Sequence, residues 1–194
     1  TMAGFYTEAD YENSVIELFQ NMGYRYVYAP DLERDFKSPL YEEELDEALH
    51  RLNPTMPEDA IADALYKLKN FENAELVQKN ALFMDYLQHG VEVRYFVKGE
   101  ERSGLVYLVD YNNPGNNSFI VANQWTFVEN SNKRPDVLLF LNGMPVVLVE
   151  LKSPSREETD ASEAYSQIRN YMHEIPSMFI YNCICVMSDL MTSK

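Results

Sequence analysis

The stretch Pro135–Lys152 reads PDVLLFLNGMPVVLVELK and carries the strongest structural signal in the chain. Its two apolar runs, Asp136–Leu141 and Pro145–Lys152, flank Asn142-Gly143, a dipeptide typical of a two-residue hairpin turn. Both runs are apolar at almost every position, a pattern typical of strands that are covered on both faces. The stretch therefore predicts two neighbouring strands at the centre of a sheet.

Three charged residues interrupt this apolar pattern. Asp136 opens the first strand, and Glu150 and Lys152 close the second. Because strand side chains alternate between faces, Glu150 and Lys152 share one face. We expect all three charges at one end of the sheet. The plainer interpretation is a solvated Glu-Lys pair at a strand end beside an ordinary turn aspartate.

Whether Asp136 and Glu150 lie on the same face of the sheet depends on the register of the hairpin. One additional residue in the loop or in a strand shifts this register by one position. A strict two-residue turn pairs Leu141 with Met144 and places Asp136 opposite Val149, on the wrong face. An odd-length loop, such as a three-residue turn with a left-handed Gly143, or a bulge elsewhere, restores the shared face. We therefore predict either a loop with an odd number of residues or a bulge in one of the two strands.

Two carboxylates and a lysine on one face suit phosphodiester hydrolysis. Asp136 and Glu150, with a main-chain carbonyl such as that of Leu151 and some waters, match the all-oxygen shell of Mg²⁺, with Mn²⁺ as the other choice. The metal would polarise the phosphate and activate water. Lys152 would either orient or deprotonate that water, or offset charge on the phosphoryl oxygens.

The rest of the chain alternates helical and extended patterns. A first helix is expected over Glu8–Met22, with Thr7 as its cap and Asp10 three residues on. Its apolar stripe is expected to consist of Tyr11, Val15, Leu18, Phe19 and Met22. A strand over Arg25–Ala29 follows. An acidic helical block at about 41–90 contains helices Tyr41–Leu52, Glu58–Asn70 and Ala74–Gln88. The remaining expected elements are an antiparallel meander of Val91–Val97, Leu105–Tyr111 and Phe119–Val128, a helix over Asp160–Glu174 and a strand over Met178–Val186.

Pro135-Asp136, a hairpin and Glu150-Leu151-Lys152 together resemble the PD-(D/E)XK nuclease motif. Gln167 and Tyr171, four residues apart on one helix face, resemble the Gln-x-x-x-Tyr element of the nuclease domain of type I restriction enzyme R subunits. The resemblance implies an α/β fold with a restriction-endonuclease-like core (αβββαβ), a central mixed sheet and an inserted helical block. Residues 1–194 would form one endonuclease domain, and the insertion at 41–90 would be structural or contact another subunit.

The same resemblance assigns functions to individual residues. The family often carries a further acidic residue on the first helix, and Glu12 is chosen as an auxiliary metal-site residue because it borders the apolar stripe of that helix. Asp136, Glu150 and Lys152 would be catalytic, and Asp136, Glu150 and the Leu151 carbonyl would bind the metal. The candidates for contacts to DNA are Gln167, Tyr171, Lys133, Arg134, Arg156 and Arg169.

The net charge of −15 argues against strong DNA binding, because basic residues supply most nonspecific affinity. Residues 1–90 hold 18 acidic and 7 basic residues, whereas residues 91–194 hold 13 and 9, so the acidity is concentrated away from the expected site. We expect weak DNA binding by this chain alone.

The resemblance implies that the polypeptide continues past Lys194 into an ATP-driven translocase, with ATP used only there. Thr1 before Met2 also suggests a fragment, and no Gly-x-x-x-x-Gly-Lys motif occurs in the chain. The implied partners are the methyltransferase and specificity subunits of a restriction complex. The rival interpretations are a noncatalytic interaction module that keeps the nuclease fold, and a standalone nuclease.

The composition also suggests where the protein resides. No apolar run is long enough to span a membrane, so we expect a cytoplasmic protein. Cys183 and Cys185, two apart on an expected strand, cannot form a disulfide and are expected to be reduced core residues.

Overall fold

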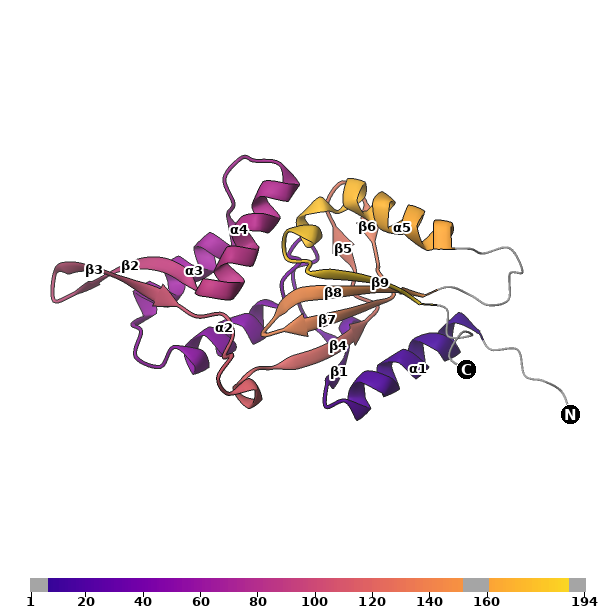
Figure 1. Cartoon of the computed structure of the whole chain (residues 1–194), viewed down its shortest axis with the longest axis horizontal. Coiled ribbons are helices and arrows are strands. Elements are labelled where there is room, and N and C mark those ends of the chain that lie inside the picture. The colour runs from indigo at the N-terminus through magenta and orange to yellow at the C-terminus, as the bar shows by residue number, and fades with distance from the viewer. Residues whose placement is uncertain (1–6, 152–160, 189–194) are drawn as a thin grey trace, which may run out of the picture.

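The computed structural model describes residues 7–151 and 161–188 (Figure 1). Its helices are α1 (Glu8–Asn21), α2 (Glu42–Leu52), α3 (Glu58–Lys69), α4 (Leu76–His89) and α5 (Ala161–Glu174), with short 3-10 helices η1 (Ala29–Asp31), η2 (Pro114–Asn116) and η3 (Pro176–Ile180). Its strands are β1 (Arg25–Tyr28), β2 (Val91–Val97), β3 (Glu100–Val106), β4 (Phe119–Asn123), β5 (Phe127–Val128), β6 (Asn132–Lys133), β7 (Val137–Leu141), β8 (Met144–Leu151) and β9 (Ile184–Ser188).

Five strands form a mixed central sheet in the order β1-β4-β7-β8-β9. β1 runs parallel to β4 and β8 parallel to β9, whereas the β4–β7 and β7–β8 pairs are antiparallel. The expected α/β class with a central mixed sheet is confirmed. β7 and β8 occupy its interior as predicted, because apolar side chains on both faces of a strand are buried only where both faces are covered.

One helix covers each face of the sheet (Figure 1). Val15 and Ile16 of α1 pack against Val121, Val137 and Val149 on one face. On the opposite face Ile168 and Tyr171 of α5 pack in a cluster with Leu138, Phe140 and Leu148. Successive side chains of β7 and β8 thus pack alternately against α1 and α5, so each strand residue belongs to the α1 face or the α5 face. By this alternation Glu150, two residues after Leu148, belongs to the α5 face.

The first helix begins as predicted. The Thr7 hydroxyl accepts a hydrogen bond from the Asp10 backbone N–H, and the Asp10 carboxylate accepts one from the Thr7 backbone N–H. The predicted apolar stripe is wrong at two positions, since Leu18 and Met22 are 54% and 64% exposed and Ile16 is buried instead. The helix is therefore fixed by its cap and by one narrow stripe.

The helical block lies at one end of the sheet, together with the β2–β3 hairpin that extends beyond it (Figure 1). The three helices agree with the prediction to within two residues at each end. They share a buried cluster with the hairpin, in which Leu45, Ile61 and Phe83 of the helices meet Val93 and Val106 of the strands. The block therefore has a core of its own, which continues into the central sheet through Met144.

The predicted three-strand meander is wrong. β2 and β3 form a separate two-stranded sheet joined by the Lys98-Gly99 turn, and β4 belongs to the central sheet. The alternation of apolar residues identified β2 correctly. It misplaced β3, because residues 100–103 are exposed and polar and the hairpin has little core to signal its register.

The last predicted strand is also partly wrong. Met178, Phe179 and Ile180 are buried in η3, and β9 begins only at Ile184. The Asn80 amide donates to the carbonyls of Phe179, Ile180 and Asn182, which satisfies backbone groups that a strand would have paired. A short apolar run does not distinguish a buried turn from a strand.

The two cysteines lie at an edge of the sheet. Cys183 and Cys185 are free thiols, but both are exposed, so their assignment to the core is corrected. They lie at β9, which is an edge strand of the central sheet. In the described part of the chain, no helix combines the length and the apolar character that crossing a bilayer requires.

Candidate functional site

The predicted shift of the hairpin register arises from a bulge in β8, which adds one residue to this strand. Asn142 and Gly143 form a strict two-residue turn with φ of 49° and 81°, and Leu141 pairs with Met144. Phe140 then pairs with Pro145, whereas Leu139 pairs with Val147, so Val146 is the extra residue. Beyond the bulge Val137 pairs with Val149, which brings Asp136 level with Glu150 on one face.

The carbonyl of the extra residue is not left without a partner. The Cys183 backbone N–H donates to the Val146 carbonyl at 2.8 Å, just before β9 begins. A bulge interrupts pairing with one neighbour, and the chain leading into β9 supplies a replacement on the other side. The register that unites the two carboxylates is therefore supported from both sides of β8.

Hydrogen bonds join Asp136 to Glu150 and to the backbone of the next residue, Leu151. The Asp136 backbone N–H donates to Glu150 Oε1 at 3.3 Å, and the Leu151 backbone N–H donates to Asp136 Oδ2 at 2.8 Å. The two carboxyl groups also hydrogen-bond to each other. Glu150 is only 6% exposed, so the pair lies at the inner edge of the sheet rather than in open solvent.

This environment opposes ionisation of the pair. Burial, followed by the negative charge of Asp136, raises the pKa of Glu150 to about 8. Burial also raises the pKa of Asp136, and the charges of Glu12 and Glu8 act in the same direction. Two adjacent buried carboxyls cannot both ionise cheaply unless a cation compensates them. The site is therefore a place where positive charge is strongly favoured.

α5 brings Tyr171 and Gln167 to the pair, as their four-residue spacing predicts. The ring of Tyr171 is buried, and its hydroxyl hydrogen-bonds to Glu150 and to the side chain of Gln167. Burial and the nearby charge of Glu150 raise the pKa of Tyr171, so the hydroxyl stays protonated at neutral pH. Gln167, Tyr171 and Glu150 thus form a polar chain that leads from the helix surface to the carboxylates.

The end of α5 is anchored by the segment that leads to Asp136. The Asn130 backbone N–H donates to the Glu174 carbonyl at 3.0 Å, and its side-chain amide donates to the His173 carbonyl at 3.1 Å. The Glu129 carboxylate accepts hydrogen bonds from the Ser177 backbone and hydroxyl. The Asn130 contacts satisfy two terminal carbonyls of α5, and the Glu129 contacts attach the residues that follow it, so together they fix the position of α5 over the sheet.

Glu12 approaches the same end of the sheet from the other face. Its carboxylate accepts hydrogen bonds from the Asn123 amide at 2.6 Å and the Gln124 amide at 3.1 Å. Asn123 is paired with Val137, the residue that follows Asp136, and Gln124 comes directly after Asn123. Neither amide was predicted from the sequence. Their only signal is a polar Asn-Gln pair directly after the apolar run 119–122.

The donor chemistry at this end of the sheet suits a hard divalent cation. The available groups are carboxylate oxygens of Asp136, Glu150 and Glu12, which Mg²⁺ and Mn²⁺ prefer over nitrogen or sulfur. Within residues 7–151 and 161–188, no cluster of three or more His, Cys, Asp or Glu is close enough to hold an ion by itself. The protein would therefore supply two or three ligands, as is usual where water completes the shell of Mg²⁺.

The remaining predicted residues divide into three groups. Lys133 is half-buried in β6, where it pairs with Phe127 of β5. Lys152 and Arg156 lie outside the described residues. Arg134 and Arg169 are exposed, and Arg169 packs over the ring of Tyr165 with its guanidinium carbon 5.9 Å from the ring centroid. The structure thus leaves Arg134 and Arg169 accessible to a ligand without showing one.

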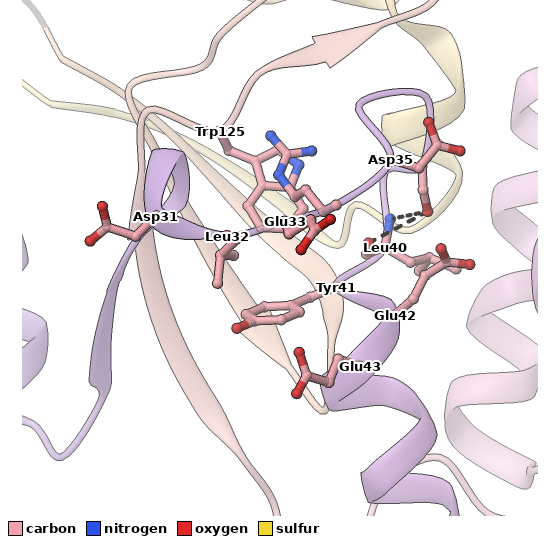
Figure 2. Close-up of a pocket in the computed structure, with 11 residues that line it drawn as sticks. Asp31, Leu32, Glu33, Asp35, Leu40, Tyr41, Glu42, Glu43 and Trp125 are labelled. Carbon is pink, nitrogen blue, oxygen red and sulfur yellow. Dashed lines mark hydrogen bonds between the residues drawn. The ribbon is translucent and has the colours of Figure 1, made fainter.

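A hollow of about 600 Å³ lies elsewhere, along the segment 31–43 (Figure 2). Its lining includes Asp31, Glu33, Asp35, Glu42 and Glu43, together with Tyr41 and Trp125. The Arg34 guanidinium stacks on the Trp125 ring at 3.8 Å and is the only basic group among the described residues of the lining. No predicted site residue that the structure describes lines this hollow, and its acidic rim would repel a phosphate backbone.

The fold and the site together define an α/β domain with a carboxylate pair, buried at Glu150 and half-buried at Asp136, at the end of a mixed sheet. The sequence profile described as type I restriction enzyme R protein N terminus matches residues 5–193. The type I restriction enzyme HindI endonuclease subunit of Haemophilus influenzae is 35% identical over 94% of this chain. The putative type I restriction enzyme MjaIXP endonuclease subunit of Methanocaldococcus jannaschii is 30% identical over 94% of this chain.

The chain therefore belongs to the family of type I restriction enzyme R protein N-terminal domains, and the predicted family is confirmed. It spans 18% of the length of these two relatives. What the whole relatives do thus depends on much more polypeptide than this chain contains.

Proposed function

We propose that this chain is the nuclease domain of a type I restriction enzyme R subunit, with a restriction-endonuclease-like fold of the PD-(D/E)XK class. It hydrolyses DNA phosphodiester bonds with a divalent metal, Mg²⁺ or Mn²⁺, bound by Asp136, Glu150 and the main-chain carbonyl of Leu151, with Glu12 as an auxiliary ligand. The order α1–β4–β7–β8–α5–β9 supports the αβββαβ core, into which the helical block is inserted between β1 and β4.

The observation that carries the proposal is the bulge at Val146. It places Asp136 and Glu150 side by side at a free energy cost, since both carboxyls have a raised pKa. Without the bulge, the side chains would lie on opposite faces and would not repel each other. A device that keeps two repelling carboxylates together is expected where a cation binds between them.

Each protein group has a distinct task in this proposal. The Leu151 backbone N–H fixes the Asp136 carboxylate, and the Tyr171 hydroxyl orients that of Glu150. A bound metal supplies Lewis acidity at the phosphate and lowers the pKa of a water. Lys152, two residues after Glu150, retains its sequence-based role of activating the water or offsetting phosphoryl charge.

The net charge of −15 requires that DNA be delivered by other parts of an assembly. The two relatives are endonuclease subunits of type I restriction enzymes, and each is several times longer than this chain. We infer a cytoplasmic complex in which an ATP-driven translocase, a methyltransferase subunit and a specificity subunit present the DNA. ATP then acts outside this domain.

The rival function is a noncatalytic interaction module that keeps the fold. Such a module would gain stability by losing one of the two carboxyls, because a lone buried carboxyl has no charged neighbour to repel. The pair and its hydrogen-bonded Tyr171 are both present, which favours the nuclease. A standalone nuclease would use the same residues, and the R-protein family of the chain favours the restriction complex.

Calorimetric titration with Mn²⁺ and Mg²⁺ tests the proposal. The wild-type chain should bind metal, and Asp136→Asn should weaken binding at least about tenfold because it removes a ligand charge. Asp59→Asn, which removes the same charge from the exposed start of α3, is the matched control and should bind like wild type.

Nicking of supercoiled plasmid in Mn²⁺ provides the second measurement. Glu150→Gln and Lys152→Ala should abolish whatever cleavage the wild-type chain shows. Equal metal binding by wild type and Asp136→Asn, or no binding by either, would favour the noncatalytic module.

A further inference from the structure

Two amide side chains hold Glu12 in a fixed position at the end of the sheet. Its Oε1 atom accepts from Asn123 Nδ2 at 2.6 Å and from Gln124 Nε2 at 3.1 Å. Both donors are neutral, so they satisfy the carboxylate without supplying a compensating charge. Glu12 is thereby immobilised and yet keeps its negative charge available to a further cation.

The orientation of the Asn123 amide is itself fixed. The Tyr26 hydroxyl donates to Asn123 Oδ1 at 2.8 Å, so the NH₂ group must face Glu12. Asn123 is 7% exposed, and a buried amide with both ends engaged cannot flip without losing both hydrogen bonds. Tyr26, Asn123 and Glu12 therefore form a chain that connects β1, β4 and α1.

The backbone at Gln124 is strained. Its φ is 57°, a left-handed conformation that non-glycine residues rarely adopt. Such strain persists where the surrounding structure requires a particular side chain, and it is common at functional sites. The side chain at this position reaches Glu12, and Gln124 directly follows Asn123, which pairs with Val137, the residue after Asp136.

We propose that Asn123 and Gln124 are positioning residues that hold Glu12 beside the divalent-metal site as an auxiliary carboxylate, with Tyr26 fixing the Asn123 amide. The inference rests on the proposed metal site and extends it to the opposite face of the sheet. Glu12 comes from α1, whereas Asp136 and Glu150 come from the β7–β8 hairpin, so the amides align groups from separate elements. The charge of Glu12 also raises the pKa of Asp136, which agrees with this proximity.

The alternative is that the amides only attach α1 to the sheet. Gln124→Gly separates the two roles, because glycine adopts a positive φ without strain while it removes the amide. Lys98→Gly is the matched control, since Lys98 has a φ of 50° in the β2–β3 turn, away from the sheet end. We expect both variants to unfold at or above the wild-type temperature.

Mn²⁺ affinity, measured by calorimetry on the wild-type chain and both variants, decides between the roles. Gln124→Gly should weaken Mn²⁺ binding about tenfold, as the loss of a group that orients a metal ligand commonly does. Lys98→Gly should leave it unchanged. Tyr26→Phe, which frees the Asn123 amide to flip, should weaken binding in the same direction but less.

Each other outcome overturns a specific statement. If wild type binds Mn²⁺ and Gln124→Gly binds it equally well, the amides are structural and this inference fails while the metal site stands. If Lys98→Gly weakens binding to the same extent, the effect does not arise at Glu12 and the inference also fails. If wild type binds no Mn²⁺, the proposed function itself fails.

Discussion

Glu150 occupies a position where an apolar residue would pack well. It follows Leu148 on the α5 face, lies against Tyr171 and is almost completely buried. Burial penalises the charged form of the carboxyl, and the neighbouring Asp136 penalises it further. The residue therefore destabilises the metal-free fold at neutral pH, and its presence is explained by chemistry rather than by packing.

The stability of the metal-free protein should consequently fall as the pH rises. The folded-state pKa of Glu150 is about 8, above the unfolded value of 4.5, so the folded state binds the extra proton between these values. The contribution that protonated Glu150 makes to the free energy of unfolding is therefore fully present below pH 4.5. It is lost as the pH rises through 8. Relative to wild type, Glu150→Gln should gain up to about 1.4 kcal/mol per pH unit across this window.

Urea unfolding in EDTA at about pH 5 to 8.5 measures the difference between the two proteins. Comparison with the variant cancels the titration of groups far from the site. Saturating Mg²⁺ should remove most of the slope in wild type, because the cation replaces the proton. Parallel stability curves for the two proteins would show that Glu150 ionises normally.

At the scale of elements, the β7–β8 hairpin connects the site to the helical block. Its turn inserts between α2 and the loop before β4. Asn142 is completely buried, and its side chain bonds to the Leu108 carbonyl, the Asn117 side chain and the Ser118 backbone N–H. The Tyr41 backbone N–H donates to the Gly143 carbonyl at 2.9 Å. The turn is thus a structural joint between the central sheet and the helical block.

Replacing Gly143 should therefore destabilise the protein strongly. A Cβ at this position would lie 2.5 Å from both the Leu45 nitrogen and the Tyr41 oxygen, and its φ is +81°. These are backbone atoms at the start of α2, which cannot move without disrupting the helix. We expect Gly143→Ala to lower the free energy of unfolding by at least about 2 kcal/mol, in the range of overpacked cores.

Gly23→Ala separates the steric effect from the conformational one. Gly23 has a φ of +99°, and a Cβ added there would meet no atom within 4 Å, so only backbone strain should act. Its expected cost is about 1 kcal/mol. Equal losses for the two variants, measured by urea unfolding, would mean that the contact with α2 is soft and that the turn is not a rigid joint.

For the whole molecule, charge limits what the chain does alone. The acidic residues concentrate in the helical block, at the end of the sheet opposite the carboxylate site (Figure 1). The exposed Arg134 and Arg169 are few beside the roughly six to ten phosphate contacts typical of specific DNA binders. The distribution permits DNA near the site but does not attract it.

We therefore expect the isolated chain to bind a duplex of about 30 base pairs with a Kd weaker than about 10⁻⁴ M at physiological salt. Fluorescence anisotropy with a labelled duplex measures this affinity, in Ca²⁺ if cleavage interferes. Binding in the micromolar range would reveal a basic surface that the described residues lack. It would also remove the reason for assigning DNA delivery to other subunits.

The sequence alone determined the elements that depend on local patterns. Thr7 and Asp10 mark the start of α1, Asn142-Gly143 marks the hairpin, and the apolar runs around them predict central strands. Gln167 and Tyr171 were placed on one helix face by spacing alone. The family motif supplied the residues of the site, and the alternation of strand side chains required an odd count between Asp136 and Glu150.

Only the tertiary structure decided how that odd count arises. The bulge at Val146 is possible because the backbone N–H of Cys183, far along the chain, binds the carbonyl that β7 leaves unpaired. The hydrogen bonds that hold Glu12 likewise come from distant parts of the chain. Tyr26 lies in β1, Asn123 in β4 and Gln124 directly after β4. Backbone hydrogen bonds and buried amides find partners through the folded chain, and no local pattern of residue types encodes which distant partner they meet.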